Sequence, residues 1–144
     1  MKLMKVSVSR VFDRPCEDVF AAWIDPQIVR LWLFVGPTNR IVDVDIEPVP
    51  GGRISIDERN DGRLIEHWGR FANVEPPHKL SFTLNVPKHF QGEALIDLDF
   101  ARLSSGCRLT LTRTQAGPPK AEEIWRRMLD GLERIFNGQP AYRQ

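Results

Sequence analysis

The sequence predicts an α+β fold in which a curved, seven-stranded antiparallel β-sheet wraps around one long C-terminal α-helix. Two observations support this prediction: a wide apolar stripe along residues 120–136, and six consecutive segments between residues 40 and 112 in which apolar and polar side chains alternate. A chain of 144 residues can bury one hydrophobic core. We therefore expect a single domain over residues 1–144, with its core at about residues 5–137.

One strand and two short helices are expected before residue 37. Residues 5–12 alternate with a period of two, although Arg10 interrupts the inward apolar set and leaves a bulge or a strand end open. Pro15 suits the first turn of a helix, and Asp25 is expected to cap a second one. The apolar sides of these helices are expected to comprise Cys16, Val19, Phe20 and Trp23, and then Ile28, Leu31 and Trp32.

Six further strands are expected, joined by short turns that make consecutive strands antiparallel neighbours. Their alternating segments are residues 42–47, 53–57, 64–74, 80–86, 94–100 and 107–112. Each has one apolar side, so the sheet should have one dry face. The dry-face residues expected in the first segment are Val42, Val44 and Ile46.

The helix over residues 120–136 is the element long enough to cover that dry face. Its apolar side chains fall within an arc of roughly 140°, while charged residues fill the opposite side. The helix should start after Gly117-Pro118-Pro119 and end at Gly138. Gly131 inside it indicates either a close contact with a strand or a bend of the helix at a cavity mouth. Residues 139–144 are expected to form a loose tail.

Composition excludes several classes of partner and location. The formal net charge is +1 and the basic residues are scattered, which gives no reason to expect nucleic acid or a membrane surface as partner. No segment reaches the ~20 apolar residues of a membrane span, and no signal peptide is recognisable. We expect a cytoplasmic monomer or homodimer in which Cys16 and Cys107 are reduced thiols.

Several short strings occur in an order that is similar to a known family. They are Pro15 through Trp23 to Asp25-Pro26, then Gly51-Gly52, Asp61-Gly62, Gly69, and Pro76-Pro77 followed by Leu80. The order resembles bacterial proteins related to the activator of the heat shock protein 90 ATPase, in the START and Bet v 1-like (SRPBCC) superfamily. The resemblance covers roughly residues 8–136 and implies a helix-grip fold.

The chain departs from the family pattern at two places. It has Trp32 and Phe34 where adjacent aromatic residues are usual, and Ile124 before Trp125 where a glycine is usual. The resemblance implies a hydrophobic cavity between helix and sheet, able to take a lipid, polyketide or flavonoid-like molecule. Some relatives are co-chaperones, and some superfamily members are cyclases or hydrolases, so fold alone does not choose among these functions.

Apolar and aromatic residues of the dry face are the candidates to line this cavity. Each aromatic residue taken singly more often fills a core, but a strongly bent sheet beneath one helix leaves a space that some must border. The candidate ligand-binding residues are Trp23, Trp32, Phe34, Ile54, Ile56, His67, Phe71, Phe82, Phe100, Trp125 and Met128.

His67 is the weak candidate for a catalytic role. It shares strand parity with Ile65 and Phe71, so it should point to the dry face, where an imidazole can bond a ligand hydroxyl or act as a general base. The alternative is a hydrogen-bonded histidine in the cavity wall. Trp68 has the opposite parity and should lie on the outer surface or at a dimer contact. Metal-binding spacings and nucleotide motifs are absent from the sequence, so we expect no metal and no cofactor.

The favoured function is therefore binding of a hydrophobic small molecule, rather than catalysis. One alternative is a chaperone-binding module with an outer patch around Trp68. The other is a cyclase or hydrolase that uses His67 in the same cavity.

Overall fold

The computed structural model describes residues 5–114 and 120–142. Its elements are β1 (Lys5–Phe12), α1 (Cys16–Ile24), α2 (Pro26–Trp32), β2 (Asn39–Ile46), β3 (Arg53–Asn60), β4 (Arg63–Glu75), β5 (Lys79–Leu84), β6 (Ala94–Arg102), β7 (Cys107–Thr114) and α3 (Ala121–Phe136). This order confirms the predicted helix-grip architecture. No helix among these residues is long and apolar enough to cross a membrane.

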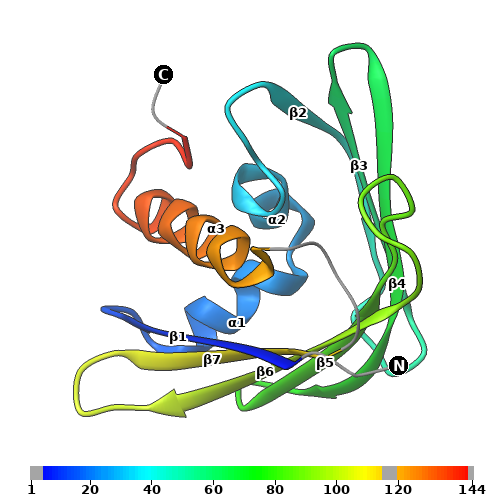
Figure 1. The fold of residues 1–144 in the computed structure, drawn as a ribbon. Coiled ribbons are helices and arrows are strands. Elements are labelled where there is room, and N and C mark those ends of the chain that lie inside the picture. The colour runs from blue at the N-terminus through cyan, green and yellow to red at the C-terminus, as the bar shows by residue number, and fades with distance from the viewer. Residues whose placement is uncertain (1–4, 115–119, 143–144) are drawn as a thin grey trace.

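The seven strands form one antiparallel sheet in the order β1-β7-β6-β5-β4-β3-β2. In Figure 1 the sheet bends into two walls, and α1, α2 and α3 all lie on its concave side. Two register shifts accompany this bend, one in β2 between Ile41 and Asp43 and one in β4 between Phe71 and Asn73. At Gly69 the backbone of Thr83 approaches so closely that a Cβ would lie 1.9 Å from its carbonyl oxygen, which only glycine permits.

Apolar contacts hold α3 on the concave face. Leu129 and Leu132 are completely buried, and Phe136 packs edge-on against Phe12 of β1 with ring centroids 5.6 Å apart. Burial of each such side chain is worth about 1.5–3 kcal/mol. This stripe therefore fixes the position of the helix on the sheet.

Arg10 points toward α3 without any break in β1. The strand pairs continuously with β7, and the Arg10 guanidinium forms ion pairs with Asp130 and, at 3.6 Å, with Glu133. An inward arginine is accommodated here because the acidic edge of α3 reaches it.

Three residues predicted on apolar sides are instead exposed: Val42, Leu31 and, on α3, Ile124. Val42 is solvent-exposed because the bulge in β2 shifts the alternation at that point. In α2 it is Val29, together with Trp32, that is buried, whereas Leu31 faces solvent. The expectation that Asp25 caps α2 is confirmed, since its carboxylate accepts a hydrogen bond from the Gln27 amide at 2.9 Å.

The segment after α3 folds back onto the helix, so the expectation of a loose tail is wrong for residues 139–142. Arg134 donates a hydrogen bond to the Pro140 carbonyl at 2.7 Å, and Ala141 packs against the core. Gly131 makes this possible, because a Cβ there would lie 3.3 Å from the Ala141 Cβ. The close contact at Gly131 is thus with the returning segment and not, as expected, with a strand. The predicted break at residues 117–119 falls outside the described residues.

The expectation of two reduced cysteines is also wrong, because Cys16 and Cys107 form a disulfide. Cys107 pairs across the sheet with Phe12, and the chain then turns at Pro15 so that α1 begins at Cys16. The two Cα atoms consequently lie 5.0 Å apart although 91 residues separate them in sequence. The link ties the start of α1 to β7.

We expect the disulfide to stabilise the fold by about 2–4 kcal/mol, because it closes a long loop in the unfolded chain. Reducing the wild-type protein should lower its free energy of unfolding, measured by urea denaturation, by that amount. The double variant Cys16→Ala/Cys107→Ala serves as the control and should unfold identically with and without reductant. Equal stability of oxidised and reduced wild type would contradict the expectation.

Candidate functional site

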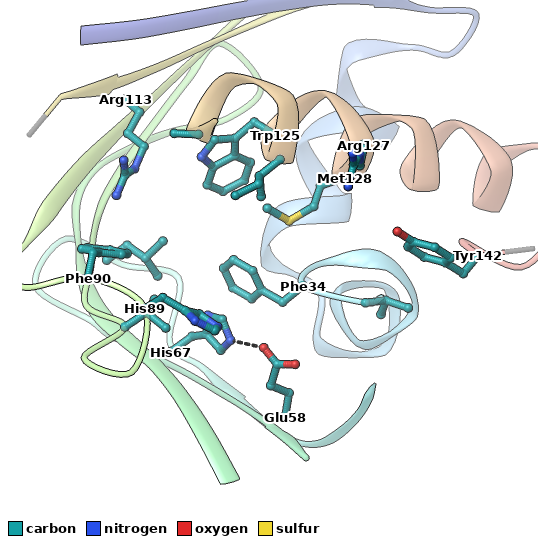
Figure 2. A pocket seen from close by; sticks show the side chains of 15 residues that line it. Phe34, Glu58, His67, His89, Phe90, Arg113, Trp125, Arg127, Met128 and Tyr142 are labelled. Atoms are coloured by element: carbon teal, nitrogen blue, oxygen red, sulfur yellow. Dashed lines mark hydrogen bonds and ion pairs between the residues drawn. The ribbon is translucent and has the colours of Figure 1, made fainter. Parts of the chain in front are cut away.

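A pocket lies between the first half of α3 and the concave face of the sheet. Its volume is ≈ 350 Å³, and nine of its fifteen lining residues are apolar. Figure 2 shows Phe34, Trp125 and Met128 facing one another across it, with His67 and Glu58 on the sheet side. The lining residues are Phe34, Val35, Glu58, His67, Leu84, Val86, His89, Phe90, Arg113, Ala121, Ile124, Trp125, Arg127, Met128 and Tyr142.

The structure places four of the predicted ligand-binding residues in this pocket: Phe34, His67, Trp125 and Met128. The others are buried in the core and do not line it; they are Trp23, Trp32, Ile54, Ile56, Phe71, Phe82 and Phe100. Aromatic packing accounts for several of them. Trp23 contacts Trp32 edge-on with ring centroids 4.8 Å apart, and Phe20 lies 5.1 Å from Phe100. These aromatic rings pack between α1, α2 and the sheet.

A buried carboxylate–imidazole pair forms the polar wall of the pocket. Glu58 on β3 and His67 on β4 are 5% and 3% exposed, and the His67 Nε2 lies 2.7 Å from Glu58 Oε1. His67 on β4 lies opposite Ile56 on β3. Glu58 comes two residues after Ile56 on β3, so its side chain lies on the same face of the sheet as His67. Because a carboxylate can only accept, His67 carries a proton on Nε2, and its Nδ1 is free of partners among the described residues.

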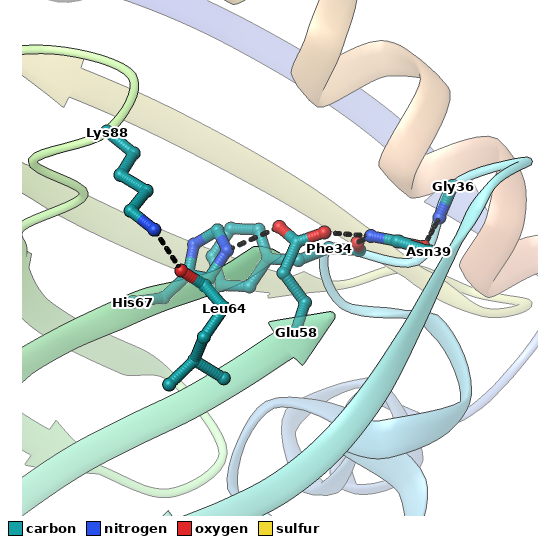
Figure 3. A network of polar contacts seen from close by, with 7 residues as sticks. All are labelled: Phe34, Gly36, Asn39, Glu58, Leu64, His67 and Lys88. Atoms are coloured by element: carbon teal, nitrogen blue, oxygen red, sulfur yellow. Dashed lines mark hydrogen bonds and ion pairs between the residues drawn. The ribbon is translucent and has the colours of Figure 1, made fainter. Parts of the chain in front are cut away.

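Asn39 holds the carboxylate from its other side, as Figure 3 shows. The Asn39 amide nitrogen donates to Glu58 Oε2 and, at 2.7 Å, to the Phe34 carbonyl. The Asn39 Oδ1 accepts from the Gly36 amide at 2.7 Å. The loop after α2 and the start of β2 are therefore tied to the Glu58–His67 pair.

Phe34 completes this arrangement from the loop. Its ring stacks on the His67 imidazole with centroids 3.9 Å apart and an interplanar angle of 16°. Its φ of 63° is uncommon for a residue with a Cβ, and such conformations persist where surrounding contacts impose them. Here the Asn39 hydrogen bond to the Phe34 carbonyl and the stacking on His67 supply those contacts.

The electrostatics of Glu58 follow from these contacts. Burial alone raises the pKa of its carboxyl, but the hydrogen bonds from His67 and Asn39 outweigh burial, and the pKa lies below its usual value. Glu58 is therefore an anion over the whole neutral range. It orients His67 and leaves Nδ1 as the ring atom able to accept a hydrogen bond or a proton.

A second buried charged group lines the pocket on β7. Arg113 is 3% exposed, and its guanidinium carbon lies 4.7 Å from the centre of the Phe90 ring. Burial lowers the pKa of the guanidinium, which nevertheless stays protonated. Its Nη2 has no hydrogen-bond partner among the described residues.

Sequence reasoning missed Glu58, Arg113 and Tyr142. The signal for the first two was present, because Glu58 shares parity with Ile54 and Ile56, and Arg113 continues the buried alternation of β7. Tyr142 follows α3 and reaches the pocket only because the chain folds back, which no local pattern indicates. Among the described residues there is no cluster of three metal-ligating side chains.

We expect Glu58→Gln to lower the free energy of unfolding at pH 7 by about 1–3 kcal/mol, because it removes the anion that accepts both hydrogen bonds. The folded-state pKa of Glu58 is lowered, so this contribution is complete above the ordinary value of 4.5 and is lost as the pH falls through the folded-state pKa. The difference between wild type and variant should therefore shrink below pH 4.5.

Urea denaturation between pH 7 and pH 3 measures this difference. Glu47→Gln removes a charge from an exposed position and should change stability by less than about 0.5 kcal/mol. A Glu58→Gln effect that is the same at pH 7 and pH 3 would show that the ionised carboxylate is not what stabilises the fold.

Comparison with known proteins identifies a family that matches most of the chain. A family model described as "Activator of Hsp90 ATPase homolog 1-like protein" matches residues 13–137. No curated protein matches the sequence.

Solved bacterial structures share the fold. An AHSA1-like protein from Aeromonas hydrophila is 23% identical, with a TM-score of 0.82 over 94% of this chain and 93% of its own. A protein from Rhodobacter sphaeroides is 22% identical, with a TM-score of 0.82 over 93% of each chain. One from Chromobacterium violaceum is 21% identical, with a TM-score of 0.79 over 91% of this chain and 95% of its own. The chain, matched over most of its length, belongs to the family of activator of Hsp90 ATPase homolog 1-like proteins, with the helix-grip fold of the SRPBCC superfamily.

Proposed function

We propose that this protein binds a small hydrophobic molecule in the pocket beneath α3. The observation that carries the proposal is a concave, largely apolar surface into which a few buried polar groups converge, which is the usual composition of a ligand site. The family and fold are compatible with a ligand-binding module. The polar groups at the wall, His67 and Arg113, would orient the ligand.

The size of the pocket narrows the ligand class. A volume of ≈ 350 Å³ lies near the lower end of the roughly 300–1,000 Å³ typical of ligand pockets. Compact ring compounds, including flavonoid-like molecules and short polyketides, or a single acyl chain, fit this volume better than a diacyl lipid. Trp125 and Phe34 offer aromatic faces to such a ligand.

We expect Met128→Trp to fill the pocket and weaken binding of any ligand at least about tenfold, a loss of roughly 1.4 kcal/mol. A panel of flavonoids, polyketides and fatty acids is first screened by native mass spectrometry, and affinities are measured by quenching of tryptophan fluorescence. Arg126→Trp is the control, because Arg126 lies on the exposed side of α3 outside the pocket. Absence of binding by the whole panel, or unchanged affinity in Met128→Trp, would remove the proposal.

A second candidate function is contact with a chaperone of the heat shock protein 90 class, as the family description suggests. The supporting observation is Trp68, which is 48% exposed on the outer side of β4, away from the pocket. A large exposed aromatic residue is a common anchor of protein–protein contacts.

For this second function we expect Trp68→Ala to abolish retention of the purified host chaperone in a pull-down at micromolar concentration. Leu31→Ala truncates another exposed apolar residue, on α2, and should retain the chaperone normally. A wild-type protein that retains no chaperone would count against this candidate and leave the pocket proposal unaffected.

A further inference from the structure

Arg113 is a charged residue of the pocket that has no counter-ion among the described residues. Glu58 accepts hydrogen bonds from both His67 and Asn39, so its charge is compensated within the fold. Arg127 is exposed and pairs with Glu123 one turn earlier on α3. By contrast, no carboxylate of the described residues lies within salt-bridge distance of Arg113.

Arg113 is held in place although it lacks an anionic partner. Its position on β7 is fixed by strand pairing with Val6 of β1 and Ile96 of β6. Its parity on β7 is that of Leu109 and Leu111, which are completely buried. The Phe90 ring contacts the guanidinium from the loop after β5. Figure 2 shows the side chain directed toward Phe90 at one end of the pocket.

A buried cation without a counter-ion is costly in free energy, because desolvation is not offset by a partner charge. An anion that enters from outside and pairs with the group would offset this cost. The guanidinium presents several N–H donors in one plane, which matches a carboxylate in two parallel hydrogen bonds. The free Nη2 of Arg113 is a donor of this kind.

We propose that the ligand of this pocket is a compact organic acid, whose carboxylate pairs with Arg113 while its apolar body lies against Trp125, Met128 and Phe34. This inference rests on the proposed ligand-binding function and specifies the chemical class of the ligand. A body of two fused rings is small enough for the volume of ≈ 350 Å³.

Three probes of one shape test the inference: 2-naphthoate, 2-naphthamide and 2-naphthamidinium, which carry a negative, a neutral and a positive head on the same ring system. Calorimetric titration of the wild type should show naphthoate bound about 10- to 100-fold more tightly than the amide, the range expected for a buried charged hydrogen bond. The amidinium should bind more weakly than the amide.

Variants assign this preference to Arg113. Arg113→Met should bind naphthoate no better than naphthamide, while Arg113→Lys, which keeps the charge, should retain part of the preference. Arg126→Met removes an exposed arginine of α3 outside the pocket and should behave as wild type. Melting curves establish that each variant is folded, and the wild-type comparison of the three probes decides the question even if Arg113→Met does not fold.

The possible failures are distinguishable. If none of the three probes binds at millimolar concentration while a member of the earlier ligand panel does, this inference is overturned and the proposed function stands; if neither the probes nor the panel bind, both are overturned. If the amide binds as tightly as naphthoate, or if Arg113→Met keeps the preference for the acid, the inference falls while ligand binding stands.

Discussion

The structure depends on the contact between a straight helix and a bent sheet. At its C-terminal half α3 packs tightly, with Phe136 against Phe12 and the Arg10 ion pairs holding the helix to β1. A straight rod cannot follow both walls of a bent surface along its whole length. Toward its N-terminal half, Trp125 and Met128 therefore border a space of ≈ 350 Å³ as well as the core. The pocket is a geometric result of the same contact that stabilises the fold.

Two kinds of buried polar group border that space, and they have different physical roles. Glu58 accepts hydrogen bonds from both His67 and Asn39, and these bonds fix the shape of the wall and stabilise the folded chain. Arg113 is constrained only by its strand and by the Phe90 ring, and its charge is not balanced within the described residues. A local rule of folding is broken at Arg113, which is where a functional constraint is expected.

Periodicity of apolar residues predicted the sheet and the long helix. It also predicted that His67 points inward, because buried and exposed residues alternate through most of β4. The same rule, applied strictly, places Glu58 and Arg113 inside, but charge in a strand ordinarily indicates solvent. Val42 could not be placed, because a bulge reverses the alternation without a local signal. The pairing of Cys16 with Cys107 depends on contacts between distant segments, which no spacing encodes.

The disulfide makes the two ends of the molecule mechanically unequal. The disulfide covalently links the start of α1 to β7, next to the Phe12–Phe136 contact at the C-terminal end of α3. The opposite end, where Ala121 and Trp125 border the pocket, has no covalent restraint of this kind among the described residues. Local opening of the fold is therefore expected first at the end without the disulfide. A ligand of the kind proposed would therefore enter and leave next to the first turns of α3, at the end of the molecule far from the disulfide.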